Sequence, residues 1–312
     1  MRVLVTGASG FVGVNLAEAL LGRGHEVVAM SLEAYPGPGG VIEIRGDTTD
    51  AALVERVMRE HRIEAVWHGA AITAGAEREK REASRIVEVN LLATVRAVEA
   101  AARAGVRRFV YPSSSAVYGE TAFDGDGPVS EDAPLRPINL YGITKVAAEA
   151  AVLRLAPALG LEACAGRINA VFGPWEHDTG LRDTLSPHLQ LAGLAREGKE
   201  AVLARGAERD WVYAPDVADA FVAMLEAKAV PPVALNISMD RLWPLEIMAR
   251  ALPGLKWRYA EPGEASNLGY GGPIDRPRRA LPPLRIQDVL GWSPAHAPGR
   301  ACAAYARWLT LA

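Results

Sequence analysis

The chain is poor in cysteine and carries almost no net charge. Its two cysteines, Cys164 and Cys302, lie far apart and outside any C-x-x-C spacing, so we expect buried thiols in a reducing compartment rather than a disulfide framework. The formal net charge is −3, which argues against a nucleic-acid partner. No apolar stretch reaches the roughly 20 residues that a bilayer requires, because Arg154 and Pro157 interrupt the best candidate. These absences predict a cytoplasmic protein that binds neither nucleic acid nor membrane.

The first two thirds of the chain alternate short β-branched runs with stretches of helical period. The N-terminus runs directly into such a strand, which leaves no room for a signal peptide. An alternation of this kind predicts an α/β fold of the Rossmann type, a doubly wound parallel sheet. The expected strands cover residues 2–5, 26–30, 41–45, 65–68, 108–111 and 162–168, and the expected helices cover 11–23, 51–61, 84–104 and a segment beginning at Tyr141.

The pattern becomes looser after Pro174. We expect partial helix over 181–197, a helix over 216–226 with Asp216 as its N-cap, and a short strand over 234–237. Residues 262–298 are rich in proline and glycine and predict little regular structure. The predicted organisation is an NAD(P)-binding domain over 1–170, to which 210–238 returns, and a smaller substrate-binding lobe formed by 171–209 and 239–312.

A glycine-rich loop joins the first expected strand to the first expected helix. It reads TGASGFVG at residues 6–13 and has the spacing G-x-x-G-x-x-G. Glycines let the backbone turn tightly and approach a pyrophosphate, and the helix N-terminus supplies unpaired N–H groups. The loop therefore predicts a dinucleotide site. Its expected contacts are Gly7, Gly10, Phe11, Val12 and Gly13.

The end of the second expected strand bears on the choice between NAD and NADP. An acidic side chain there would bind the adenosine ribose and repel a 2′-phosphate. The position is Ser31, Glu33 follows two residues later, and no arginine follows closely. Glu33 favours NAD as the cofactor, with NADP left open.

Three further strand and helix segments carry candidate cofactor contacts. Asp47, followed by Thr48, ends the third strand, where its carboxylate can accept a hydrogen bond from the adenine amino group or cap the next helix. Gly69, Ala70 and Ala71 end the fourth strand with the small side chains needed where a backbone passes under a dinucleotide. Asn90 lies inside an expected helix, where asparagine is unfavourable, which indicates a hydrogen-bonding role near the cofactor.

Tyr141 and Lys145 have the spacing Y-x-x-x-K and follow a serine run, PSSSAVYG at 112–119. One helical turn separates the two residues, so their side chains share a face. A free tyrosine with a pKa near 10 is mostly protonated at neutral pH, and a nearby ammonium and a positive nicotinamide would favour its phenolate. With the glycine loop, the pair predicts a nicotinamide enzyme whose base is a tyrosine.

These segments together resemble the extended short-chain dehydrogenase/reductase superfamily, in particular its NAD-dependent nucleotide-sugar epimerase/dehydratase family. The resemblance also includes VFGP at 171–174, RDWVYAPDVA at 209–218 and LGWSP at 290–294, so it covers essentially the whole chain. It implies that Tyr141 is the general base, that Lys145 supplies charge and binds the nicotinamide ribose, and that Ser114 bonds the reacting oxygen. Ser113 is then expected beside the cofactor and Ser115 beside the substrate.

The same resemblance bears on the reaction and on assembly. Dehydratases of the family usually carry an Asp-Glu pair where this chain has Ser115–Ala116, which disfavours dehydration. We expect an NAD-dependent epimerase of a nucleotide sugar, of the UDP-glucose 4-epimerase type. The alternatives are a dehydrogenase or reductase of a free sugar, a sugar acid or another small hydroxy compound, and a non-catalytic NAD(P)-binding regulator. The resemblance also implies a homodimer formed through the long helix and the Tyr141 helix.

The expected substrate contacts depart partly from the family pattern. Relatives commonly have an asparagine directly before VFGP, where this chain has Ala170, with Asn169 one place earlier. Arg209 matches an arginine that grips a nucleotide diphosphate, and Arg278 or Arg279 can supply a second grip. Two guanidiniums would serve equally for the carboxylate of a sugar acid.

The segment 175–183 is unusually charged for a substrate lobe. It predicts either a lid that carries Arg182 and His177 toward a polar ligand, or a solvated loop with internal ion pairs. We expect no metal site there, because adjacent residues point in different directions and no i, i+4 histidine pair occurs. The complete set of expected substrate contacts is Ser115, Asn169, Arg182, Arg209 and Arg278.

Overall fold

The computed structural model describes residues 1–311 except 179, 181–182, 184, 271–275 and 277. The first part of the chain holds β1 (Arg2–Thr6), α1 (Phe11–Gly22), β2 (Glu26–Ser31), β3 (Ile42–Arg45), α2 (Ala51–Glu60), β4 (Ala65–His68), α3 (Ala76–Val87), the π-helix η1 (Glu88–Leu92), α4 (Ala93–Ala104), β5 (Arg108–Ser114), the 3₁₀ turns η2 (Ser115–Val117) and η3 (Glu120–Ala122), α5 (Leu140–Ala158) and β6 (Glu162–Ile168). The second part holds β7 (Ala170–Phe172), α6 (Pro187–Arg196), β8 (Ala201–Leu203), β9 (Trp211–Tyr213), α7 (Ala214–Glu226), β10 (Ala234–Ile237), α8 (Glu246–Ala251), β11 (Trp257–Tyr259), α9 (Leu284–Leu290) and α10 (Pro298–Leu311).

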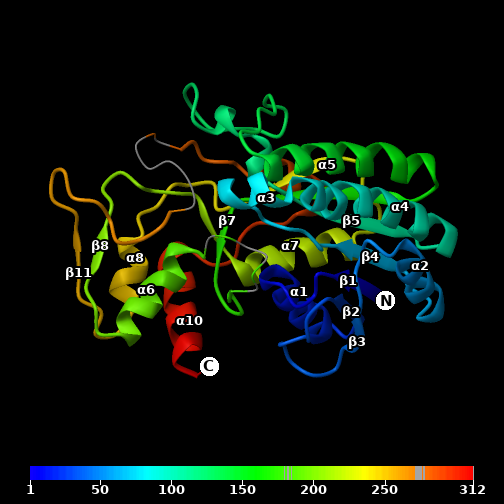
Figure 1. Ribbon diagram of the computed structural model, residues 1–312, viewed down its shortest axis with the longest axis horizontal. Coiled ribbons are helices and arrows are strands. Elements are labelled where there is room, and N and C mark those ends of the chain that lie inside the picture. Colours follow the sequence, from blue (N-terminus) through cyan, green and yellow to red (C-terminus); the bar gives the residue numbers. More distant parts are fainter. Residues whose placement is uncertain (179, 181–182, 184, 271–275, 277, 312) are drawn as a thin grey trace.

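A parallel sheet of seven strands forms the centre of the molecule, in the order β10-β6-β5-β4-β1-β2-β3. Helices α4 and α5 run along one side of it, and α1 and α7 along the other (Figure 1). The strand order reverses between β1 and β4, which creates a crevice at the carboxyl ends of the strands. The predicted α/β, doubly wound fold is confirmed.

Alternation along the strands explains why both faces are covered. In β1, Val3 and Val5 pack with α1 and α7, whereas Leu4 between them packs with α2, α4 and α5. All three side chains are fully buried. Successive strand residues point to opposite faces, so a strand buried on both sides must be apolar throughout.

The C-terminal lobe has its own aromatic core, to the left of the sheet in Figure 1. Phe172 lies inside it, and His188 stacks on its ring with 3.9 Å between the ring centroids. His188 is therefore a packed residue of α6. Two short parallel pairs, β7 with β9 and β8 with β11, frame the lobe, while β10 joins the central sheet. The division of the chain into domain and lobe stays a prediction.

Three segments differ from the sequence prediction. The expected helix over 84–104 begins earlier, at Ala76, and the π-helix η1 interrupts it around Asn90. Asp216 does not cap α7, which begins at Ala214 with Tyr213 as its N-cap, because Pro215 suits the first helical turn. The carboxylate of Asp216 instead accepts hydrogen bonds from Ala295 N and His296 N. Strands β7, β8, β9 and β11 were not predicted. Of the expected partial helix over 181–197, residues 181, 182 and 184 lie outside the described residues, and α6 covers Pro187–Arg196.

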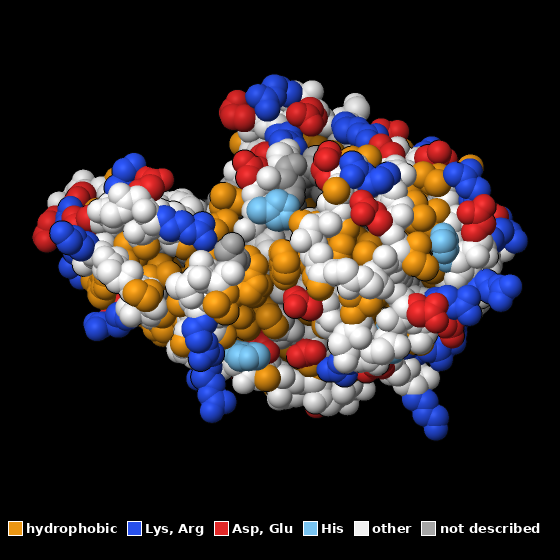
Figure 2. All heavy atoms as spheres, turned by 90° about the horizontal axis from the view of Figure 1, so that it is seen from below, with side chains coloured by type: hydrophobic (Ala, Val, Ile, Leu, Met, Phe, Trp, Pro, Cys, Tyr) orange, Lys and Arg blue, Asp and Glu red, His pale blue; other side chains and the backbone are white. Residues whose placement is uncertain are grey.

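The surface mixes charges of both signs. On the face shown in Figure 2, lysine and arginine side chains are interspersed with aspartate and glutamate, and apolar side chains lie between them. Such a mixed surface accords with the formal net charge of −3. Within the described part of the chain, no helix combines the length and the apolarity that a membrane crossing demands.

Candidate active site

The glycine loop between β1 and α1 is shaped by close backbone contacts. Gly7 has a φ of +66°, and a Cβ on it would lie 2.9 Å from the Cα of Ala70. A Cβ on Gly13 would lie 2.5 Å from the carbonyl oxygen of Gly7. Phe11, Val12 and Gly13 form the first turn of α1, whose N–H groups lack partners within the helix. The loop thus keeps an open backbone surface where a pyrophosphate can bind.

Buried polar atoms without partners lie at the carboxyl ends of three neighbouring strands. Among the described residues, none hydrogen-bonds Nε2 of His68 at the end of β4, Oγ of Ser113 in β5, or either amide atom of Asn169 after β6. Buried polar groups are normally paired, so these atoms indicate a polar ligand at this edge of the sheet. With the glycine loop, the residues present fit a dinucleotide.

The corner at the ends of β2 and β3 carries the expected adenosine contacts. The hydroxyl of Ser31 accepts a hydrogen bond from Ser9 N in the glycine loop at 2.8 Å. Arg45 is the register partner of Ser31, so an arginine does lie near this position in space. Its Nη2 and Nη1 atoms are 3.8 Å and 3.7 Å from the carboxylates of Glu33 and Glu43. Because the guanidinium of Arg45 lies near two carboxylates, this corner offers no excess positive charge for the 2′-phosphate of NADP. The arrangement therefore agrees with NAD as the cofactor.

Asp47 and Asn90 make protein contacts that the sequence did not predict. Asp47 is not the cap of α2; Asp50 has that role, and Asp47 accepts hydrogen bonds from Thr49 N and Arg85 Nη2. Asn90 bonds both backbone groups of Ile72 and the hydroxyl of Thr144. It therefore ties the loop after β4, which includes Gly69, Ala70 and Ala71, to the helix that carries Tyr141. Thr48, which directly follows Asp47, is also buried. Direct contacts of Asp47, Thr48, Asn90 and residues 69–71 with the cofactor stay predictions.

Tyr141 and Lys145 lie on one face of α5, against the end of β5. Lys145 Nζ is 5.8 Å from the ring centroid of Tyr141 and donates a hydrogen bond to the carbonyl oxygen of Pro112 at 2.8 Å. Lys145 is buried, and burial lowers its pKa to about 7, although the charge of Glu149 opposes the shift. The ammonium is thus placed beside the tyrosine, as the Y-x-x-x-K spacing predicts.

The lowered pKa of Lys145 predicts how the stability of the nucleotide-free protein depends on pH. The folded value is about 7 and the ordinary value is 10.5, so the unfolded chain binds more protons between these limits. The free energy of unfolding should therefore rise as the pH increases from 7 toward 10, and the cost of burying the ammonium is fully present below pH 7. Urea unfolding of wild type and Lys145→Met at several pH values measures this, and parallel curves would contradict it.

The serine run after β5 brings two parts of the chain together. Ser114 Oγ accepts a hydrogen bond from Ala116 N at 3.1 Å, which caps the turn η2. Ser115 Oγ accepts one from Arg278 Nη2 at 2.9 Å. The C-terminal lobe thereby reaches the segment in which Ser114 is expected to bond the reacting oxygen.

Arg209 is buried, and its charge acts on that of the partly buried Arg278. Burial and the charge of Arg209 lower the pKa of Arg278 to about 10, and Asp210 partly offsets the shift. Asp210, which the sequence analysis did not single out, is buried and accepts hydrogen bonds from Met239 N and Leu281 N. The guanidinium of Arg279 bonds the backbone carbonyls of the 121–128 loop, so Arg278 is the better candidate for the predicted second grip, which stays a prediction.

The charged segment 175–183 is anchored by its acidic residues. Glu176 is buried and accepts a hydrogen bond from Ser186 N at 2.7 Å, at the start of α6. Asp183 accepts one from Gly75 N at 2.7 Å and pairs with Arg78 of α3. His177 Nδ1 lies 2.8 Å from the carbonyl oxygen of Trp175. The segment thus links α3 to α6 through contacts outside itself, and Arg182 lies outside the described residues.

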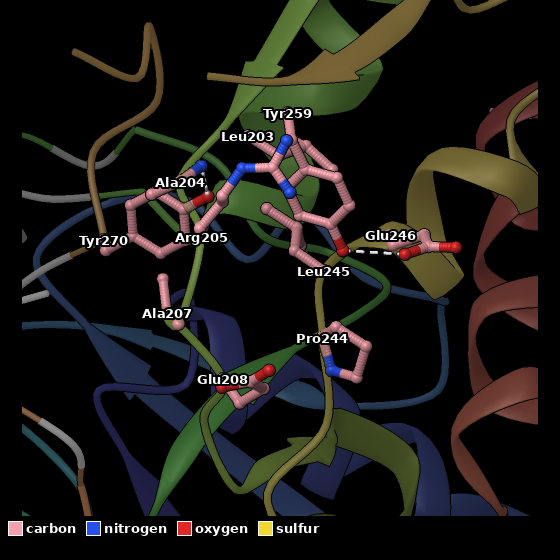
Figure 3. Close-up of a pocket in the computed structure, with 11 residues that line it drawn as sticks. Leu203, Ala204, Arg205, Ala207, Glu208, Pro244, Leu245, Glu246, Tyr259 and Tyr270 are labelled. Atoms are coloured by element: carbon pink, nitrogen blue, oxygen red, sulfur yellow. Dashed lines mark hydrogen bonds between the residues drawn. The ribbon is translucent and has the colours of Figure 1, made fainter. Parts of the chain in front are cut away.

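A separate cavity of about 280 Å³ lies in the lobe and was missed by sequence reasoning, because distant segments build it. Tyr259, Glu246 and Arg205 line one side, with Arg205 over the tyrosine ring and the tyrosine hydroxyl bonded to Glu246 at 2.7 Å (Figure 3). Tyr270 lines the other side and accepts a hydrogen bond from Ala204 N. Glu208, also in the lining, directly precedes Arg209 in the chain.

Comparison with known proteins identifies relatives of the whole chain. A sequence model described as the NAD dependent epimerase/dehydratase family matches residues 3–238. A UDP-glucose 4-epimerase of Corynebacterium glutamicum is 32% identical, over 95% of this chain and 92% of its own length.

Two solved structures are similar in sequence as well as in fold. MoeE5 in complex with UDP-glucuronic acid and NAD is 30% identical with a TM-score of 0.79, over 100% of this chain and 99% of that one. The UDP-glucose 4-epimerase of Thermus thermophilus in complex with NAD is 28% identical with a TM-score of 0.82, over 99% of both chains. The predictions of an enzyme and of NAD as its cofactor are confirmed, and the chain belongs to the NAD-dependent epimerase/dehydratase family.

Proposed function

We propose that the protein epimerises a nucleotide sugar in an NAD-dependent reaction of the UDP-glucose 4-epimerase type. The observation that carries the proposal is the arrangement of Tyr141 and Lys145 beside the serine run, with Arg278 reaching the same segment. The tyrosine base and a positive charge that can bind a phosphate then lie close enough to contact one substrate.

The proposed roles follow from position. Tyr141 removes the proton from a ring hydroxyl and returns it later, and the nearby ammonium of Lys145 favours the phenolate that this requires. Ser114 donates a hydrogen bond to the reacting oxygen. When bound, NAD takes up and gives back the hydride of the same carbon. Returning the hydride to the opposite face of the sugar inverts that centre and restores the cofactor.

The arginine pair and the lobe cavity support a nucleotide-linked substrate. Arg209 supplies positive charge that a diphosphate needs, and Arg278 adds a second cation to the same part of the site. The cavity beside Glu208 and Arg209 offers tyrosine rings and polar groups, which suit a nucleobase. MoeE5 binds UDP-glucuronic acid, and the Thermus thermophilus relative is a UDP-glucose 4-epimerase. We propose the same class of substrate here.

One observation favours the second candidate, a dehydrogenase of a sugar acid. Ala170 replaces the asparagine that relatives place before VFGP, and Asn169 is buried without a partner among the described residues. The departure from the family pattern weakens the expectation of a diphosphate contact at this position, and the arginines would suit a carboxylate equally well. The Ser115–Ala116 pair continues to disfavour dehydration.

A substrate panel separates the candidates. Purified protein with NAD is incubated with UDP-, GDP- and dTDP-sugars and with free sugar acids, while absorbance at 340 nm and the NMR spectrum of the product are recorded. An epimerase gives a new stereoisomer without net NADH. Accumulating NADH with a free sugar acid would reject the epimerase and support the dehydrogenase.

We also propose that the protein is a cytoplasmic homodimer that pairs through α4, η1 and α5. Leu92 and Ile143 are large apolar side chains exposed on η1 and α5. We expect Ile143→Glu to convert the dimer to a monomer, because a charge would be buried at the contact. Light scattering after gel filtration measures this, with Leu284→Glu on α9 as the control. A monomeric wild type would contradict the proposal.

A further inference from the structure

Arg278 lies at the sugar end of the candidate site. Its Nη2 donates a hydrogen bond to Ser115 Oγ at 2.9 Å, and Ser115 directly follows Ser114. Ser115 is buried, so the contact lies inside the protein. The ring of Phe123 flanks the guanidinium at 6.0 Å. Arg278 therefore reaches the part of the substrate that reacts.

Arg209 lies at the other end of the cluster. Its Nη1 donates a hydrogen bond to the carbonyl oxygen of Glu208. Burial lowers the pKa of Arg209, and the nearby Tyr270 opposes that shift. Glu208 and Tyr270 both line the lobe cavity. Arg209 is thus placed toward the nucleotide end, and Arg278 toward the sugar.

The charges around Arg278 favour an anion. The like charges of Arg209 and Arg278 repel each other, and the carboxylate of Asp210 offsets this repulsion only in part. The carboxylate of Asp210 already accepts hydrogen bonds from Met239 N and Leu281 N. An anion in addition to the Asp210 carboxylate would reduce the repulsion between the two guanidiniums.

One edge of the Arg278 guanidinium indicates which kind of anion it can bind. Nε of Arg278 is buried and has no hydrogen-bond partner among the described residues. Nε and Nη2 lie on one edge of the guanidinium, the edge that a planar carboxylate takes with two parallel hydrogen bonds. The hydroxyl of Ser115 at Nη2 is a further donor for the same group.

We propose that Arg278 and Ser115 bind a carboxylate on the sugar ring, so that the preferred substrate is a nucleotide-linked uronic acid. The inference rests on the proposed function and narrows its substrate class. Arg209 then holds the diphosphate, and each arginine has its own anion.

The test compares UDP-glucuronic acid with UDP-glucose, which differ in the carboxylate. We expect wild type to prefer the uronate in kcat/KM. Arg278→Gln should lower the ratio of the two kcat/KM values by about 30-fold or more, because truncating one member of a buried charge pair has an effect of this size. Arg278→Lys should restore part of the ratio, since it keeps the charge but loses the bidentate edge. Circular dichroism checks that each variant is folded.

Arg209→Gln is the matched control and should lower kcat/KM for both substrates by a similar factor. Calorimetric dissociation constants for both nucleotides, measured with the NAD-loaded protein, provide a readout apart from turnover. The inference is overturned if Arg278→Gln lowers kcat/KM equally for both substrates, which would assign Arg278 to the diphosphate. It is also overturned if wild type has the higher kcat/KM for UDP-glucose. Binding of UDP-glucuronic acid that depends on Arg278 but gives no epimer would support the inference and reject the proposed function. Absence of binding for both nucleotides would overturn both.

Discussion

Replacing Tyr141 by phenylalanine is expected to lower the rate of epimerisation by about 10²–10⁴-fold, the usual contribution of a general base. The ring keeps its place on α5 beside Lys145, so the loss isolates the hydroxyl. The amount of bound NAD should change little, because the glycine loop that is expected to hold it lies in a different segment. Epimer formation followed by NMR and the absorbance of released cofactor measure the two quantities.

Tyr305→Phe is the control for this substitution. Tyr305 is buried in the lobe core, and its hydroxyl has no hydrogen-bond partner among the described residues. Removal of that hydroxyl should leave the rate unchanged. If Tyr141→Phe retained full activity, another residue would have to be the base, and the non-catalytic alternative would need to be tested again.

Removal of the Glu149 carboxylate is expected to give the largest loss of stability. Glu149 lies one turn after Lys145 on α5 and bonds Nε and Nη2 of Arg167 in β6, and the two side chains are only 5% and 6% exposed. Arg167 also donates to the hydroxyl of Tyr118 at 2.9 Å. Glu149→Ala leaves an uncompensated buried guanidinium, which lowers the free energy of unfolding by about 3–5 kcal/mol. Urea denaturation measures the change.

Glu77→Ala tests whether the burial of the Glu149–Arg167 ion pair is what makes its loss so destabilising. Glu77 pairs with Lys80 on α3, and both side chains are largely exposed. Water screens such a pair, so its loss should have a much smaller effect. Equal destabilisation by the two substitutions would contradict the account. A double variant, Glu149→Leu with Arg167→Met, should recover part of the stability because it removes both buried charges.

The sheet could be predicted from the sequence where the signal is local. The strands at 65–68 and 162–168 begin and end as predicted, because glycine marks a boundary of each: Gly69 directly follows the first, and Gly160 shortly precedes the second. The short strands of the lobe, such as β8, pair with segments more than 50 residues away. Nothing in three residues marks such a pairing, so these strands were missed.

The candidate site shows the same limit. Tyr141 and Lys145 could be placed together because one helical turn joins them. The contact of Arg278 with Ser115 spans 163 residues, and no local spacing encodes it. Arg278 and its neighbour Arg279 look alike in the sequence, and only the fold assigns one to the serine run and the other to backbone carbonyls. Arg45 likewise reaches the Ser31 corner through strand pairing rather than through sequence.

The most direct test of the central claim follows the hydride. UDP-glucose or UDP-glucuronic acid that carries deuterium at C4 is incubated with the NAD-loaded protein, and the product is examined by NMR and mass spectrometry. Reversible transfer within one active site predicts a C4 epimer that keeps the deuterium at C4 and no accumulation of reduced cofactor. Deuterium that appears in solvent or in released NADH would contradict the account.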